Sequence, residues 1–162
     1  MTGAPAERSA LRAIASGGLV AGTFDIGFAI LFYGYARGSD AVRVLQSVAS
    51  GWLGKAAFDG GAGAVVLGLV THFAIATGAA AVFYGASRVL PALVHKPVAG
   101  GIVFGIGLFA FMNLVVIPLS AAPFRPSFAP ASALPGVAVH MFLIGLPIAL
   151  CARRFGPDPE PV

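Results

Sequence analysis

Residues 61–84 read GAGAVVLGLVTHFAIATGAAAVFY, an apolar run without Asp, Glu, Lys or Arg. An α-helix rises about 1.5 Å per residue, and the hydrocarbon core of a bilayer is about 30 Å thick. A helical run of this length is therefore long enough to cross a membrane. The stretch predicts a transmembrane helix with one imidazole, His72, near its middle.

Three more apolar runs accompany it, at about residues 13–35, 98–119 and 134–152. None shows the short alternating segments of a β-barrel, so helices are expected throughout. We therefore predict an all-α fold, an integral membrane four-helix bundle that forms a single transmembrane domain over residues 1–154.

The composition supports the membrane class. Of 162 residues, 58% are hydrophobic and 10% are charged, and the mean hydropathy is +0.92. Ten Lys and Arg with six Asp and Glu cannot cover the surface of a soluble domain of this size. The formal charge of +4 does not indicate nucleic acid, because the basic residues stand singly between apolar runs. The expected partner is the lipid bilayer.

The basic residues also predict the orientation. With four spans, six of them fall on the side of the chain ends and four on the opposite side: Arg8, Arg12, Arg88, Lys96, Arg153 and Arg154 against Arg37, Arg43, Lys55 and Arg125. Basic residues are more frequent on the cytoplasmic side of membrane proteins. We expect both termini in the cytoplasm, in a bacterial inner membrane.

The connection between the first two spans predicts an amphipathic helix at about residues 40–57, with Ser39 or Asp40 as its N-cap. One face carries Ala41, Leu45, Val48, Trp52 and Ala56, and another carries Arg43, Gln46, Ser47 and Ser50. Such a helix lies in the membrane interface with its tryptophan at headgroup depth. A re-entrant segment that caps the bundle is the alternative.

Two other segments are expected to lack long helices. The connection at 120–135 contains Pro123, Pro126, Pro130 and Pro135, which favour an extended crossing. The tail at 155–162, FGPDPEPV, is polar and rich in proline, so disorder is expected there. Cys151 stands alone at the end of an apolar run, which favours a packing role and excludes an intramolecular disulfide.

Small residues four apart predict close helix contacts. Gly18 with Gly22, and Gly101 with Gly105, form GxxxG pairs, and the run from 74 to 85 adds Ala74 with Gly78 and Ala81 with Gly85. Such faces could also hold a second copy of the chain or a larger membrane complex.

Four ionisable or amide side chains interrupt the spans: Asp25, His72, Asn113 and His140. Asp25 and His72 share helix faces with small residues, so they are expected to point toward neighbouring helices rather than lipid. Both fall near mid-membrane, where they could pair directly. The alternative is that each polar residue only forms hydrogen bonds between helices.

Three functional hypotheses follow. The first is a non-enzymatic protein that carries protons or a small solute, or responds to pH, through this intramembrane site. The second is a structural or assembly subunit. The third is a metal or haem protein with His72 and His140 as ligands and Asp25 beside them, although no HxxxH or HExxH spacing is present. The sequence does not identify a cofactor. It contains no GxSxG, P-loop or dinucleotide motif that would indicate an enzyme.

Three further residues lie at or near the outer end of the second span. Asp59 is expected to cap that helix, or else to form an outer mouth together with Trp52 and Lys55.

The second half resembles the YagU-like family of small bacterial inner-membrane proteins. The similarity rests on Thr71-His72-Phe73, Tyr84-Gly85, Pro91, the glycine-rich run at 100–107, Pro118-Leu119, Pro123 and His140. The resemblance implies a membrane protein of unestablished biochemistry, with an association with acid resistance for one member. Of the polar residues in the spans, His72 and His140 match the family's pattern and Asp25 does not. The resemblance identifies no catalytic residue.

Overall fold

The computed structural model describes residues 9–156, without the side chains of Arg37 and Ser132, so Arg8 and the tail beyond 156 lie outside the described residues. Within this range the chain is helical and contains no strand. Its elements are α1 (Ala10–Arg37), α2 (Ala41–Leu53), η1 (Gly54–Asp59), α3 (Gly61–Val89), α4 (Ala92–His95), α5 (Pro97–Phe111), η2 (Met112–Val116), α6 (Ile117–Leu119), α7 (Pro130–Val139), η3 (His140–Gly145) and α8 (Leu146–Phe155).

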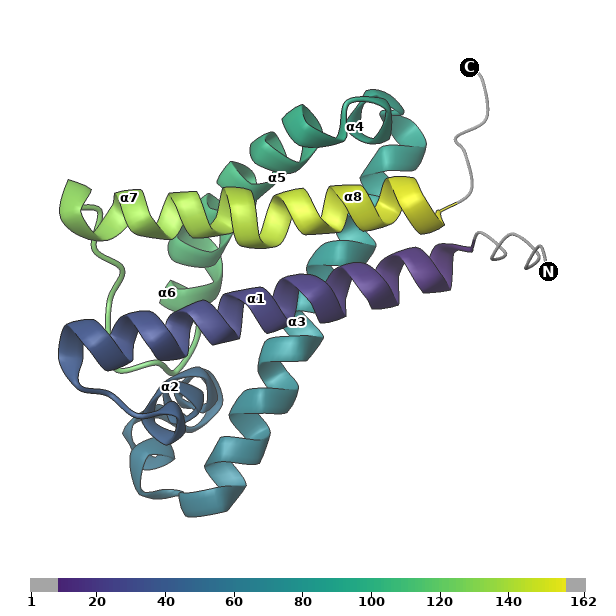
Figure 1. The fold of residues 1–162 in the computed structure, drawn as a ribbon. Coiled ribbons are helices and arrows are strands. Elements are labelled where there is room, and N and C mark those ends of the chain that lie inside the picture. The colour runs from purple at the N-terminus through teal and green to yellow at the C-terminus, as the bar shows by residue number, and fades with distance from the viewer. Residues whose placement is uncertain (1–8, 157–162) are drawn as a thin grey trace.

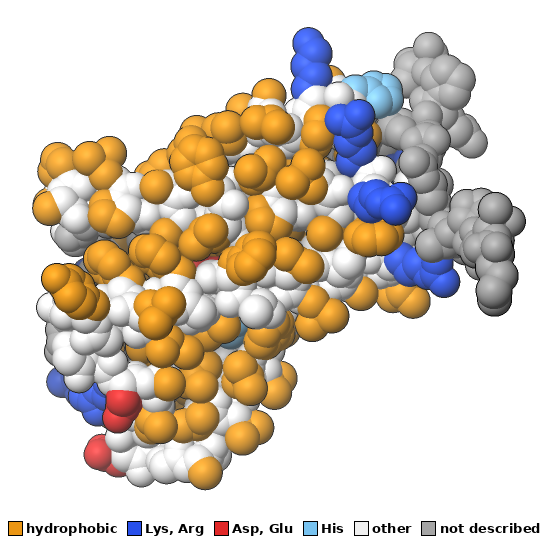
Figure 2. Space-filling view, in the orientation of Figure 1, with side chains coloured by type: hydrophobic (Ala, Val, Ile, Leu, Met, Phe, Trp, Pro, Cys, Tyr) orange, Lys and Arg blue, Asp and Glu red, His pale blue; other side chains and the backbone are white. Residues whose placement is uncertain are grey.

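Four helical segments are long and apolar enough to cross a membrane: Ala10–Ala36, Gly61–Val89, Pro97–Leu119 and Ala133–Phe155. The third is built from α5, η2 and α6, and the fourth from α7, η3 and α8. The predicted all-α four-helix membrane fold is confirmed. Apolar side chains cover most of the visible surface, as expected for helices that face lipid (Figure 2).

Local sequence signals explain where the helices begin and end. The Ser9 hydroxyl accepts a hydrogen bond from Arg12 N–H at 3.2 Å and caps α1, which ends at Gly38 in a left-handed conformation with φ 63°. Asp40 caps α2 as predicted, because its Oδ1 accepts from Arg43 N–H at 2.7 Å. Gly60 is the N-cap of α3, and no side chain caps that helix, so Asp59 does not have the capping role.

The fourth span begins earlier than the sequence indicated. Helix α7 starts at Pro130 and contains Pro135, so the extended connection ends at residue 129. Proline is well suited to the first helical turn, where its missing N–H has no partner to lose. The remaining connection is fastened to α2, since Ala121 N–H donates to Gly51 O at 2.9 Å.

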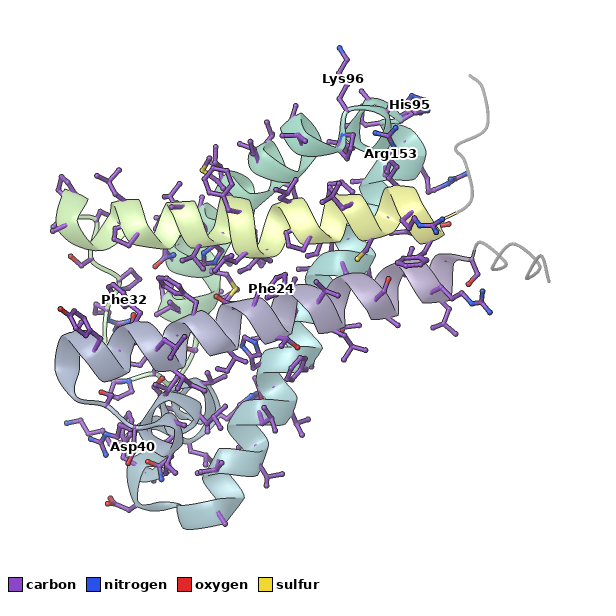
Figure 3. All side chains as sticks on the ribbon, in the orientation of Figure 1. Phe24, Phe32, Asp40, His95, Lys96 and Arg153 are labelled. Atoms are coloured by element: carbon purple, nitrogen blue, oxygen red, sulfur yellow. The ribbon has the colours of Figure 1, made fainter. Side chains whose placement is uncertain are left out.

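Both described chain ends lie at the same end of the bundle (Figure 1). Ser9 N–H donates a hydrogen bond to Phe155 O at 2.8 Å, so α1 and α8 are joined directly there. Lys96 and Arg153 lie at this end, whereas Asp40 lies at the opposite end (Figure 3). We call these the chain-end half and the loop-end half of the molecule.

The chain-end half holds the larger apolar core. Its buried members come from α1, α3, α4 and the fourth span: Ala21, Ala79, Ala80, Phe83, Val94, Ile144, Ile148, Ala149 and Ala152. Most are small, so the helix backbones approach closely, and Phe83 fills the remaining space edge-on to Phe104 at 5.1 Å.

Glycines allow the tightest crossings. A Cβ on Gly105 would meet the His140 carbonyl and would lie 2.7 Å from Met141 Cα, and one on Gly101 would lie 2.8 Å from Leu146 Cα. A Cβ on Gly18 would lie 2.7 Å from Thr77 Cα. The two predicted GxxxG pairs therefore lie at real helix contacts. By contrast, Gly78 and Gly85 have no such neighbour within 4 Å.

Helix α2 is seen nearly end-on in Figure 1, across the direction of α1. It packs against α3, and Gly68 gives the Leu45 carbonyl room to approach. Gln46 and Ser50 are buried while Trp52 is exposed, which agrees with a place for Trp52 at the membrane interface. Ser50 Oγ donates to Ser47 O at 2.6 Å, which lowers the cost of burying its hydroxyl.

Candidate functional site

A cavity of about 640 Å³ lies in the loop-end half. It extends from Ala79 and Ile144, beside the core, to the connections at the loop end. All four polar residues predicted for the intramembrane site, Asp25, His72, Asn113 and His140, line it. The structure thus brings together side chains from four separate spans.

His72 is held in a defined orientation by α1. Its Nε2 lies 2.8 Å from the Gly22 carbonyl oxygen, and a carbonyl can only accept, so Nε2 carries a hydrogen and donates. The ring also packs edge-on to Phe73 at 5.3 Å. Its second nitrogen, Nδ1, is therefore the one left for the cavity side.

Asp25 faces that second nitrogen. Asp25 Oδ2 lies 4.0 Å from His72 Nδ1, and the side chains are 28% and 11% exposed. With Nε2 protonated, a neutral His72 presents a lone pair at Nδ1 to a carboxylate that can only accept. At 4.0 Å the two groups are not hydrogen-bonded, and a hydrogen bond between them requires one added proton and a closer approach.

His140 lines the same cavity from the fourth span. Its Nδ1 donates to Gly136 O of its own helix at 2.9 Å, which leaves Nε2 as the free ring nitrogen. The ring packs edge-on to Phe109 at 5.4 Å. Asn113 Nδ2 likewise donates within its own helix, to Phe109 O at 2.8 Å.

Asn113 and His140 share an unusual backbone setting. Each lies in a π-helical turn, where Ile117 N–H bonds to Met112 O and Leu146 N–H bonds to Met141 O. Each turn is followed by a proline, Pro118 or Pro147, which has no N–H to continue the α-helical pattern. π-Helical turns are frequent at functional sites, and here both present a polar side chain to the cavity.

The mouth of the cavity contains basic side chains that were not predicted from the sequence to belong to the site. Arg43 and Arg125 line it, and both are exposed. Ser39, Ser47 and Ser127 also line the cavity. The Arg43 guanidinium lies over the Phe58 ring at 4.2 Å. Loop arginines beside proline and serine give no periodic signal, so only the three-dimensional structure connects them with Asp25.

The three residues predicted for an outer mouth are at the loop end but do not line the cavity. Trp52 is 69% exposed, and its Nε1–H donates to Thr71 Oγ1 at 3.1 Å. Lys55 and Asp59 are exposed on η1.

Within residues 9–156, no group of three or more His, Cys, Asp or Glu side chains is arranged to hold a metal ion. Cys151 is half-buried on α8, where its Cβ faces Gly17 of α1.

The fold and the cavity define a multi-pass α-helical membrane protein with a polar site inside the bundle. No family model, curated protein or solved structure matches the chain.

Proposed function

We propose that the protein carries a small solute together with a proton, and that the Asp25–His72 pair binds the proton at the inner end of the cavity. The supporting observation is the pair itself: His72, oriented by the Gly22 carbonyl, presents Nδ1 to Asp25 Oδ2 at 4.0 Å, where one added proton would allow a hydrogen bond on closer approach. Ionisable groups are costly within a membrane and are usually functional there.

The proposed direction of access follows from the two halves. The cavity opens among the loops at the loop end, while small-residue packing closes the chain-end half. The π-helical turns beside Pro118 and Pro147 are the places where the third and fourth spans could bend to change this access.

We further propose a bacterial inner membrane, with the chain ends in the cytoplasm. Basic side chains gather at the chain end (Figure 2), which supports this orientation. A fluorescent protein fused to the C-terminus should fluoresce inside cells, and a periplasmic reporter should be inactive there. Kinship with the YagU-like family is part of this proposal, and its association with acid resistance agrees with a proton-binding pair.

Infrared difference spectroscopy between about pH 5 and 8, where imidazoles titrate, tests the proton site. We expect acidification to change a carboxyl or imidazole band that Asp25→Asn removes and His72→Gln shifts. Asp59→Asn is the matched control, because Asp59 is exposed and outside the cavity. A band change that survives Asp25→Asn would contradict the proposal.

A subunit role is the second candidate, supported by α3. Ala74, Gly78, Ala81 and Gly85 are all exposed on that helix, and the two glycines have no neighbour within 4 Å. Sizing in a mild detergent separates the two functions, because an assembly subunit should migrate with a larger complex.

A further inference from the structure

The charges that line the cavity favour an anion. The lining contains two guanidinium groups, of Arg43 and Arg125, and one carboxylate, of Asp25. With the histidines counted as neutral, the formal charges therefore sum to a positive value. Any proton added to the Asp25–His72 pair makes the lining more positive. A cation entering from the loop end would first meet both arginines.

Neither arginine is neutralised by a carboxylate. The Arg43 guanidinium has the Phe58 ring as its contact, and within the described part of the chain neither arginine has an ion pair. A guanidinium group presents a planar fork of donors that matches a carboxylate or phosphate. The exposed Ser127 also lines the cavity and its hydroxyl is a further donor there.

Apolar side chains line the cavity beside these polar groups. Val48, Ile75, Met112 and Ile117 are among them. Asp25 and Tyr33, eight residues apart on α1, both line the cavity, so its polar ends are separated by about 12 Å along the helix axis. An occupant therefore needs an anionic head and a short apolar body.

We propose that the cavity binds a small organic anion, with its oxyanion head between Arg43 and Arg125 and its apolar body directed toward the Asp25–His72 pair. This inference rests on the proposed function and names the class of its solute. A free carboxylate and an anionic lipid share this chemistry.

Binding of benzoate to the full-length protein in phosphatidylcholine nanodiscs is the test. We expect saturable binding that weakens about tenfold or more in Arg43→Gln and in Arg125→Gln, since each removes charge-assisted hydrogen bonds. Lys55→Gln is the matched control, because Lys55 is an exposed loop-end cation outside the cavity. Benzylammonium, with the same ring and the opposite charge, should not compete.

Each comparison has a result that would overturn the inference. Equal binding of benzylammonium, or benzoate binding that Arg43→Gln and Arg125→Gln leave intact, would exclude the anion site. Inorganic phosphate that binds as tightly as benzoate would exclude the apolar body. Competition by phosphatidylglycerol in the nanodisc would keep the site and assign its anion to the lipid.

Proton uptake measured in the same samples separates this inference from the proposed function. Benzoate binding without an accompanying, Asp25-dependent proton uptake would keep the anion site and reject the proton coupling. Asp25-dependent proton uptake without benzoate binding would do the reverse.

Discussion

The chain-end half and the loop-end half are built from the same four spans but differ in what lies between them. In the chain-end half, alanines and glycines bring the helices together around Phe83 and Ile148. In the loop-end half the spans enclose a cavity lined by Asp25, His72 and His140. The difference indicates that stability comes chiefly from one half and the proposed chemistry from the other.

The largest expected effect is on the crossing between α5 and η3. In Gly105→Ala the new Cβ would meet backbone atoms of His140 and Met141, which cannot turn away as a side chain could. We expect a loss of about 3 kcal/mol in the free energy of unfolding, the upper end for overpacking. Unfolding in detergent with a chemical denaturant measures it.

Gly107→Ala is the control for that substitution. Gly107 lies on the same helix, and a Cβ there would have no neighbour within 4 Å. Its stability should stay equal or rise by up to about 1 kcal/mol, because alanine favours helix. Similar losses in both variants would show that the crossing is not the cause.

The crossing of α1 and α3 should be affected next. Gly18→Ala places a Cβ 2.7 Å from Thr77 Cα and close to the Thr77 hydroxyl. The expected destabilisation is about 2 kcal/mol, because part of the conflict is with a side chain that can turn. Gly27→Ala on the same helix has open space and should change the thermal midpoint little.

A smaller effect on stability is expected in the cavity. Asp25→Asn keeps the size of the side chain, and Asp25 is 28% exposed, so the free energy of unfolding should change by less than about 1 kcal/mol. Proton uptake on acidification should nevertheless be lost. A loss of stability as large as that of Gly105→Ala would remove the distinction between the two halves.

A similarly small effect on stability is expected at the surface of the loop-end half. Trp52→Phe removes the indole N–H that donates to Thr71 at 3.1 Å, while the ring stays at an exposed position. The net value of such a hydrogen bond is about 0.5–1 kcal/mol. Thr71→Val, measured by the same unfolding assay, should give the same loss, and the double variant should give no more.

The spans and the approach of Asp25 to His72 could be predicted because both follow from helix periodicity. An uninterrupted apolar run fixes the length of a helix, and the spacing of Gly18, Gly22 and Asp25 fixes a shared face. The glycines of this face let the α1 backbone approach α3 closely, so α3 is its packing partner. These signals are local, so a single sequence contains them.

The mouth and the buried face of α2 could not be predicted in this way. Arg125 lies in an irregular connection, whose position depends on the hydrogen bond from Ala121 to Gly51. Gln46 and Ser50 are polar, yet they are buried because α2 packs on α3 through a backbone contact at Gly68. These features depend on tertiary contacts. The amphipathic pattern of α2 predicts the side of Trp52 as the one that faces the membrane interface, but not which residues contact α3.

The junction of Ser9 with Phe155 has a consequence for biosynthesis. The first span to be made packs against α8, the last, and the two are also joined by this hydrogen bond. Contacts of such high sequence separation form slowly, because a long loop must close first. Helix α1 is therefore made before its partner and stays without this contact in the bilayer until α8 has been synthesised. A truncation that removes α8 should leave α1 without this partner and exposed to membrane proteases.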